Sequence, residues 1–130
     1  MTDRRPDCVY GILARDGRVF LRRLPEGWGL PGGTFPPMAD HRKNELRGLL
    51  WDQLGIDAGS IWAQGAFDYR NPDEETERFS GFYTVWEWDG EVPEDAGAWV
   101  GAASLSEFDL PASLRILLLS VLSMETMRTS

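Results

Sequence analysis

Residues 27–56 read GWGLPGGTFPPMADHRKNELRGLLWDQLGI, and this stretch decides the fold. Its first part belongs to the segment 25–37, which is rich in proline and glycine and is therefore predicted to be mostly loop. Gly32 and Gly33 have no side chain, so the backbone there is able to pass close to a ligand or to a neighbouring helix. The stretch is predicted to begin with a strand end and a tight glycine turn.

The second part of the stretch, from about Asp40 to Leu54, is predicted to be an α-helix. Asp40 suits the N-cap position, and Gly55 suits the C′ position that ends a helix. Four leucines recur at helical spacing and are expected to form the buried stripe: Leu46, Leu49, Leu50 and Leu54.

The segments on either side are predicted to add antiparallel strands and one more helix. Residues 9–14 and 18–22 form a hairpin, because the Asp16-Gly17 dipeptide between them suits a tight turn. Further strands are expected at 61–69, 79–88 and 98–102, with an acidic turn at 71–78.

The last helix is predicted to begin at Leu110, with Pro111 in its first turn. Its tail is expected to fray after Met124. This order of elements indicates an α+β sandwich.

Length and charge exclude some classes of function. The chain has 130 residues, which fits a single domain over 1–130. Its net charge of −8 argues against a protein that neutralises many phosphates of DNA or RNA, so no nucleic acid polymer is expected as a partner. An anionic small molecule remains compatible, because a divalent cation can lie between two negative partners.

Cys8 is the one cysteine, so no intrachain disulfide forms and a reducing, cytoplasmic location is expected. Cys8 lies in an apolar run and is expected to be a buried, inert thiol. The polar N-terminus lacks the apolar segment of a signal peptide. The longest apolar run, 116–119, is too short to span a bilayer, so no membrane partner is expected.

The loop and helix of 27–56 have the form of a cation site. A helix projects carboxylates at i, i+3 and i+4 from one face, and three such oxygens suit Mg²⁺ or Mn²⁺. A metal held in this way bridges pyrophosphate oxygens and activates water.

The same stretch resembles the box of the Nudix (MutT-like) hydrolase family, G-x5-E-x7-R-E-U-x-E-E-x-G-U, in which U is aliphatic. Residues 28–33, WGLPGG, reproduce the common lead-in W-x-L-P-G-G, and Gly55-Ile56 reproduces the end. The stretch from Trp99 to Arg115 is similar to the family's usual strand, turn and final helix. The resemblance spans nearly the whole chain. It implies a Nudix-like α/β/α sandwich with a mixed β-sheet between helices.

This resemblance also implies a magnesium-dependent hydrolase that cleaves a nucleoside diphosphate linked to another moiety. The chain departs from the pattern, however, because it has one residue more between Gly33 and Gly55. If the extra residue lies in the loop, Asp40 takes the first Glu position, Gly48 the Arg and Leu49 the following Glu. Asp52 and Gln53 then take the Glu pair. This alignment is preferred, because it keeps an acid at position 40 and needs no bulge in the helix.

If the extra residue instead lies late in the helix, Ala39 takes the first Glu position and Arg47 keeps the Arg. Gly48 then takes the next Glu, and Trp51 and Asp52 take the pair. In both alignments Asp52 is the acid that survives in the core of the box. Losing a positioned base costs roughly 10²–10⁴-fold in rate, so activity is expected to be weak or altered.

Other acids could rebuild the site. His41, Glu45 and Asp52 fall within about 40° of one another on a helix of 100° per residue. Glu94 precedes Trp99 by five residues, where the family often has a further acidic ligand or base. The predicted metal ligands are therefore Asp52 and Glu45, the predicted catalytic residues are Asp52 and Glu94, and the cofactor is Mg²⁺ or Mn²⁺. Each acid has a plainer interpretation as a solvated side chain.

Substrate contacts are predicted at the glycine turn, Gly32 and Gly33, and at Arg22 and Trp28. Arg22 ends a strand beside the loop and could meet a phosphate. Trp28 could stack on a base, or pack under the loop. The expected partner is a nucleotide-derived small molecule.

Two functions from other classes stay open. A chain that has lost most of the box could be a catalytically inactive module that binds a nucleotide or a protein and regulates something. It could also be a structural subunit of a homodimer, with exposed aromatic side chains at the interface.

Overall fold

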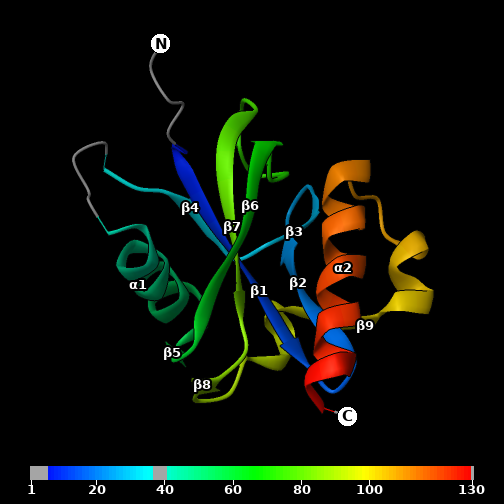
Figure 1. Ribbon diagram of the computed structural model, residues 1–130. Coiled ribbons are helices and arrows are strands. Elements are labelled where there is room, and N and C mark those ends of the chain that lie inside the picture. The colour runs from blue at the N-terminus through cyan, green and yellow to red at the C-terminus, as the bar shows by residue number, and fades with distance from the viewer. Residues whose placement is uncertain (1–5, 37–40, 130) are drawn as a thin grey trace.

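The computed structural model describes residues 6–36 and 41–129, and its chain forms a mixed sheet between two helices (Figure 1). The helices are α1 (Arg42–Leu54) and α2 (Ala112–Thr129), with short 3₁₀ turns η1 (Glu94–Ala96) and η2 (Ala102–Glu107). The strands are β1 (Cys8–Arg15), β2 (Arg18–Leu24), β3 (Gly27–Gly29), β4 (Gly32–Thr34), β5 (Asp57–Ala58), β6 (Ile61–Tyr69), β7 (Arg78–Val85), β8 (Trp88–Asp89) and β9 (Gly97–Gly101).

The main sheet has seven strands. Its path runs β3-β2-β1-β7-β6, with β4 also paired to β1 and β9 also paired to β2. The β1–β7 pair is parallel, from Cys8 opposite Ser80 to Leu13 opposite Val85, and the other pairs are antiparallel. The predicted mixed sheet is confirmed. Strands β5 and β8 form a separate two-stranded sheet.

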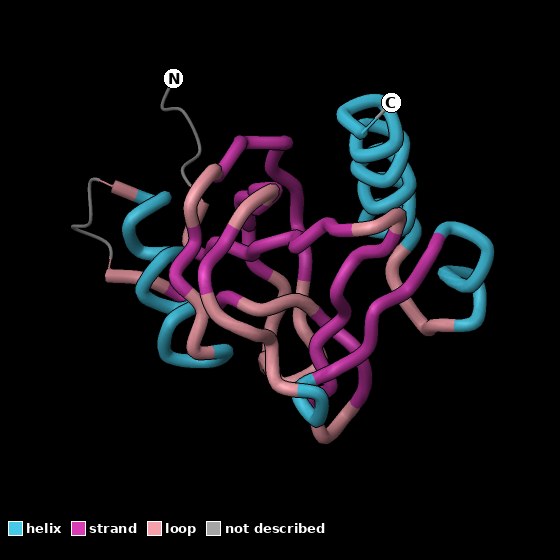
Figure 2. Tube along the Cα trace, turned by 90° about the horizontal axis from the view of Figure 1, so that it is seen from below, coloured by secondary structure: helices cyan, strands magenta, loops and turns pink. Residues whose placement is uncertain are grey.

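Alternation along β1 explains why a helix covers each face of this sheet. Tyr10 and Ile12 point to the cluster that contains the buried leucines of α2, such as Leu114. Val9 and Leu13 point to the cluster that contains those of α1. Successive strand residues face opposite sides, so this one buried strand separates two hydrophobic cores. Figures 1 and 2 show α1 and α2 on opposite sides of the strands.

The predicted glycine loop is more regular than expected. The segment 25–37 was predicted to be mostly loop, but it contains the short strands β3 and β4. Strand β3 pairs with the end of β2, and β4 pairs with the start of β1. Extended glycine backbone is able to join a sheet where a neighbouring strand offers hydrogen-bonding partners. Such partners lie far away in the sequence, so local composition does not reveal them.

The last helix also differs from the prediction. It begins at Ala112, two residues after the predicted start at Leu110, and is helical as far as Thr129. Glu125, buried on this last part of α2, accepts a hydrogen bond of 3.1 Å from the N–H of Gly17 in the β1–β2 turn. This tertiary contact joins α2 to the β1–β2 turn. The long strand expected at 79–88 is divided, with β7 ending at Val85 and β8 following at Trp88.

Candidate functional site

The glycine turn lies between β1 and α1. On one side β4 pairs with β1, with Gly32 opposite Tyr10. A Cβ atom at Gly32 would lie 2.1 Å from the carbonyl oxygen of Val9, and Gly32 has φ +135°. Only glycine therefore fits this position, because a side chain would meet the backbone of β1. The turn therefore packs against the sheet on one side and faces the helix on the other.

Gln53 of α1 holds the turn from the helix side. Its Oε1 atom accepts a hydrogen bond of 2.9 Å from the N–H of Gly32, and its Nε2 atom donates one of 2.9 Å to the carbonyl oxygen of Gly32. A primary amide both donates and accepts, so it pairs with a backbone unit as a neighbouring strand would. A carboxylate only accepts, and it could not make the second bond. Gln53 thus attaches α1 to the glycine turn.

Asn71 holds the other end of the turn in the same manner. Its Oδ1 atom accepts a 3.1 Å hydrogen bond from the N–H of Leu30, and its Nδ2 atom donates one of 2.9 Å to the carbonyl oxygen of Leu30. The hydroxyl of Tyr69 donates a further bond to Asn71 Oδ1. Asn71 is 1% exposed, so these bonds satisfy a buried side chain and a buried loop.

Sequence reasoning did not find either amide contact. Gln53 was noted only as a departure from a glutamate, and Asn71 only as the start of an acidic turn. The sequence offered one clue at position 53. The carboxylate implied by the resemblance only accepts hydrogen bonds, whereas the amide of Gln53 also donates them.

The helix α1 agrees with the preferred alignment of the box. It is continuous from Arg42 to Leu54 without a π-helical turn. Gly55 follows in the left-handed conformation with φ 70°, as predicted. The preferred alignment needs no bulge, and the described helix contains none, while the choice between the two alignments stays a prediction. Asp40, the predicted N-cap and first acid, lies outside the described residues.

Leu49 stands at a glutamate position of the box in the preferred alignment. It is half-buried and packs against the cluster of buried residues beneath α1. Val92, Ala96 and Trp99, from the segment that leads into β9, pack against the same cluster. An apolar side chain therefore occupies a place where the resemblance implies an acid.

The acids that were predicted to rebuild the site come from two segments of the chain, α1 and η1. Asp52 is exposed near the end of α1, and Glu45 is half-buried two turns earlier. Glu94 lies in η1, outside the helix. Among residues 6–36 and 41–129, no three His, Cys, Asp or Glu side chains come close enough together to hold a metal ion.

The described residues therefore do not fit the divalent cation that the resemblance implies. Mg²⁺ and Mn²⁺ prefer several negatively charged oxygens. Gln53 offers a neutral amide that is already bonded at both ends, and Leu49 offers no oxygen. Asp52 is the single carboxylate of the box core in the described part of the chain.

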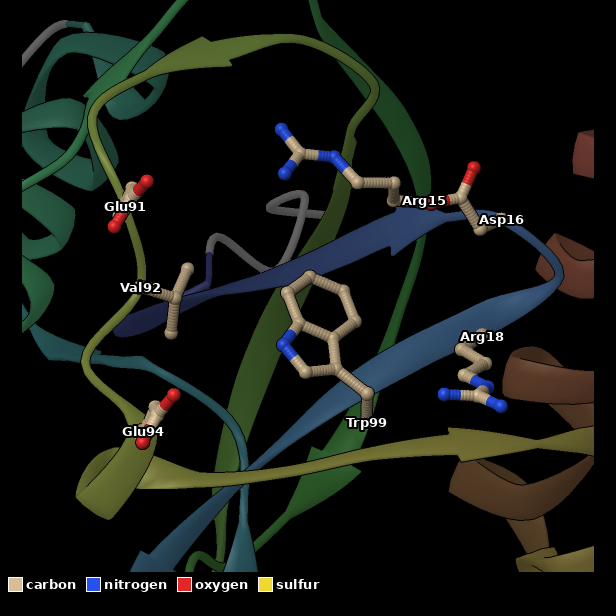
Figure 3. A pocket seen from close by; sticks show the side chains of 7 residues that line it. All are labelled: Arg15, Asp16, Arg18, Glu91, Val92, Glu94 and Trp99. Carbon is tan, nitrogen blue, oxygen red and sulfur yellow. The ribbon is translucent and has the colours of Figure 1, made fainter.

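Glu94 lines a cavity of about 370 Å³, which we call the Glu94 cavity (Figure 3). Its lining consists of Arg15, Asp16, Arg18, Glu91, Val92, Glu94 and Trp99. The two glutamates come from the segment between β8 and β9, and the arginines come from the β1–β2 hairpin opposite, with Trp99 between them. Oppositely charged walls on either side of an aromatic ring suit a polar, planar ligand.

A stack of side chains supports that aromatic ring. The rings of Trp88 and Trp99 lie at 5.9 Å and 13°, and the guanidinium of Arg15 lies 4.0 Å over the Trp88 ring. Cation–π attraction keeps Arg15 at the mouth of the cavity. Trp88 is buried and Trp99 is half-buried.

A second cavity, of about 470 Å³, lies beside the glycine turn, and we call it the Trp28 cavity. Its lining consists of Glu26, Gly27, Trp28, Tyr69, Arg70, Pro72, Asp109, Leu110 and Pro111. The Trp28 ring meets the Phe108 ring edge-on at 5.1 Å, and Arg23 lies 5.1 Å over it. Trp28 thus packs in part, as the plainer interpretation expected, while it also borders open space.

The remaining predicted contacts are placed differently. Arg22 lies opposite Gly29 in the β2–β3 ladder and lines neither the Glu94 cavity nor the Trp28 cavity. Gly32 and Gly33 are buried in the backbone of β4. Of the predicted substrate contacts, Trp28 alone lines one of these two cavities. The neighbouring Arg23 of the same strand lies over the Trp28 ring instead.

Burial also sets the protonation of three groups near the turn. It raises the pKa of Tyr10 and Tyr69 far above that of an exposed phenol. Burial likewise raises the pKa of the Cys8 thiol, although a hydrogen bond with Tyr10 lowers it in part. Cys8 is buried and protonated, as expected of a structural thiol rather than a nucleophile.

The sequence matches no protein-family model. No curated protein matches it either. Solved structures do match its fold. A MutT NUDIX hydrolase from Burkholderia pseudomallei superposes with a TM-score of 0.69 at 22% identity, over 89% of this chain and 97% of that one. A MutT protein from Methanosarcina mazei superposes with a TM-score of 0.69 at 20% identity, over 92% and 93% of the two chains.

The NUDIX domain of Shewanella oneidensis NrtR, solved in complex with ADP ribose, superposes with a TM-score of 0.60 at 15% identity, over 99% of this chain and 91% of that one. The chain therefore has the fold of the MutT/Nudix hydrolases, as the resemblance of residues 27–56 predicted. No helix in the described part of the chain is long and apolar enough to span a membrane.

Proposed function

We propose that this chain is a Nudix-fold binding module that holds a nucleotide-derived small molecule without metal-dependent hydrolysis. The pair of hydrogen bonds between Gln53 and Gly32 carries the proposal. At a position where the resemblance implies a metal-binding glutamate, the side chain is neutral and holds the loop in place itself. The neighbouring Leu49 is packed against the core.

The Trp28 cavity is the proposed binding site. It combines an aromatic face, Trp28, with a cationic side chain, Arg70, and a carboxylate, Asp109. A base stacks on an aromatic ring with about 1–3 kcal/mol, and a guanidinium recognises phosphate. A volume of about 470 Å³ is sufficient for a nucleoside-sized group. The bound ADP ribose of the NrtR domain supports this class of ligand.

A weak metal-dependent hydrolase is the second candidate. Glu94 favours it, because this acid lines a cavity together with Glu91. Asp52 and Glu45 of α1 would then have to act as ligands of the metal, and Asp52 or Glu94 would have to act as the base. In the described chain no three acids come close enough together to hold a metal ion, so this candidate requires the side chains of α1 and η1 to rearrange around the ion.

A calorimetric titration with ADP-ribose distinguishes the two functions. In the presence of EDTA we expect binding to persist, and Trp28→Ala to weaken it about tenfold or more. Trp62→Ala is the matched control, because Trp62 is exposed on β6 and lines neither cavity. Asp52→Ala is expected to leave the affinity unchanged.

Hydrolysis is measured in parallel by phosphorus NMR with Mg²⁺ or Mn²⁺ present. Cleavage that requires metal and disappears in Asp52→Ala would establish the hydrolase instead of the binding module. The absence of both binding and cleavage, across a panel of nucleoside diphosphate derivatives at millimolar concentration, would contradict both candidates.

A further inference from the structure

A group of positively charged side chains surrounds a hollow of about 400 Å³ at the start of α1. We call it the basic hollow. It is lined by His41, Arg42, Lys43, Asn44, Arg47 and Tyr83, none of which lines the Glu94 cavity or the Trp28 cavity. It therefore has no part in the function proposed above.

The guanidinium of Arg47 is held in a fixed orientation. Its Nε atom donates to the carbonyl oxygen of Ala58 at 3.3 Å, and its Nη2 atom donates to that of Gly59 at 3.1 Å. Its Nη1 atom donates to Asn44 Oδ1 at 3.1 Å. These acceptors carry no net charge, so the positive charge of Arg47 is positioned but not neutralised. Two of its five N–H groups remain available.

Arg42 and Lys43 have no acidic partner among the described residues. No ion pair or hydrogen bond joins either side chain to the described part of the chain. The Nε atom of Arg42 is buried and has no hydrogen-bond partner there. A buried donor without a partner costs about 1–3 kcal/mol, so such a group is uncommon unless something else satisfies it.

The local charge contrasts with that of the whole chain. The chain carries a net charge of −8, yet the described residues that line the basic hollow include three permanently positive side chains and no carboxylate. Glu45, the acid of the first turn of α1, lies about 160° around the helix from Arg47. A concave surface of one sign concentrates the field and attracts a counter-ion.

We propose that the basic hollow binds a phosphate group, either free or as a phosphomonoester. A phosphate dianion has several acceptor oxygens, which match a guanidinium, an ammonium and a hydroxyl converging from different directions. Tyr83 supplies the hydroxyl from β7, across the hollow from the helix. The ligand would bond to the N–H groups of Arg47 that remain available and balance its charge.

The test is a titration of the ¹⁵N-labelled chain with inorganic phosphate, at an ionic strength held constant with sodium chloride. We expect saturable shifts of the backbone amides of residues 42–47. The double variant Arg42→Gln, Lys43→Gln is expected to weaken the affinity for phosphate at least tenfold, since charged hydrogen bonds contribute about 1.5–3 kcal/mol each. Arg78→Gln is the control, because it removes the same kind of charge from an exposed site on β7.

Titration with glucose 6-phosphate distinguishes a phosphomonoester from the free ion. Binding of either probe at residues 42–47 supports the proposal. Chloride producing the same shifts as phosphate would overturn it, because the effect would then be general screening. Equal affinities of the double variant and Arg78→Gln would also overturn it. The readout does not involve nucleotide binding, so failure here leaves the function of the Trp28 cavity untouched, and the reverse also holds.

Discussion

Gln53 and Gly32 exchange two hydrogen bonds of 2.9 Å, which join the helix α1 to the glycine turn across 21 residues of sequence. The side-chain amide of Gln53 accepts from the N–H of Gly32 and donates to its carbonyl oxygen, as the backbone of a neighbouring strand would. In this chain the geometry of the loop therefore depends on a neutral side chain. Where the resemblance implies a glutamate, this chain has a neutral amide that holds the loop.

The first prediction is that Gln53→Glu makes stability depend on pH. A protonated carboxyl both donates and accepts, so it retains both bonds to Gly32, whereas a carboxylate loses one and faces a carbonyl oxygen. The pKa of this new group is thus raised in the folded state. Its contribution is complete below the unfolded pKa of about 4.3 and is lost as the pH rises through the folded pKa.

We expect Gln53→Glu to lower the free energy of unfolding by about 1–3 kcal/mol at pH 7 and by much less at pH 4. Urea unfolding at both pH values measures it. Gln64→Glu is the control, since Gln64 makes no side-chain hydrogen bond with the described part of the chain. The same loss at both pH values would show that the second hydrogen bond is not important.

The second prediction concerns Asn71, which bonds to both polar groups of Leu30 and to Tyr69. Asn71→Ala leaves a buried N–H and a buried carbonyl oxygen without partners, and each such group costs about 1–3 kcal/mol. We expect urea unfolding to show a loss of roughly 3 kcal/mol or more. Asn44→Ala on the exposed surface of α1 is the control, with an expected loss below about 0.5 kcal/mol. Similar losses would contradict the role of Asn71.

The third prediction contrasts two adjacent glycines. Gly32→Ala would place a Cβ atom 2.1 Å from the carbonyl oxygen of Val9, so we expect the variant not to fold. Gly33 has φ +153°, but a Cβ atom there would meet nothing within 4 Å. Gly33→Ala is therefore expected to fold, with a loss of about 1–3 kcal/mol from backbone strain alone. Circular dichroism with thermal unfolding distinguishes them, and equal behaviour of the two variants would refute the close contact.

The fourth prediction follows from the buried phenols of Tyr10 and Tyr69. Their raised pKa means that the folded state holds protons which the unfolded state releases above about pH 10. Stability is complete below that pH and falls as the pH rises further, by about 1.4 kcal/mol per pH unit for each phenol. Tyr69→Phe removes one of the two groups. We expect urea unfolding between pH 10 and 11 to show a shallower slope, and an unchanged slope would contradict the assignment.

Much of the fold could be predicted from residues 27–56, because local patterns carry it. Leucine spacing defined the buried face of α1, and Gly55 ended the helix as expected. The short strands β3 and β4 were missed, since their pairing partners in β1 and β2 are distant in the sequence. Trp28 was predicted to stack on a base or to pack under the loop, and it packs on Phe108 while it lines the Trp28 cavity. Asp52, Glu45 and Glu94 remain predictions.

The sequence alone determined most of the order of elements and the departure of residues 27–56 from the pattern that they resemble, since residue identity and spacing are local properties. Only the tertiary structure showed which backbone groups the side chains of Gln53 and Asn71 bind. The bonds of Gln53 to Gly32 and of Asn71 to Leu30 span 21 and 41 residues, so they form only when the sheet brings those segments together. An amide has no preferred partner until the fold places an unpaired backbone unit beside it, and that placement is a property of the whole chain.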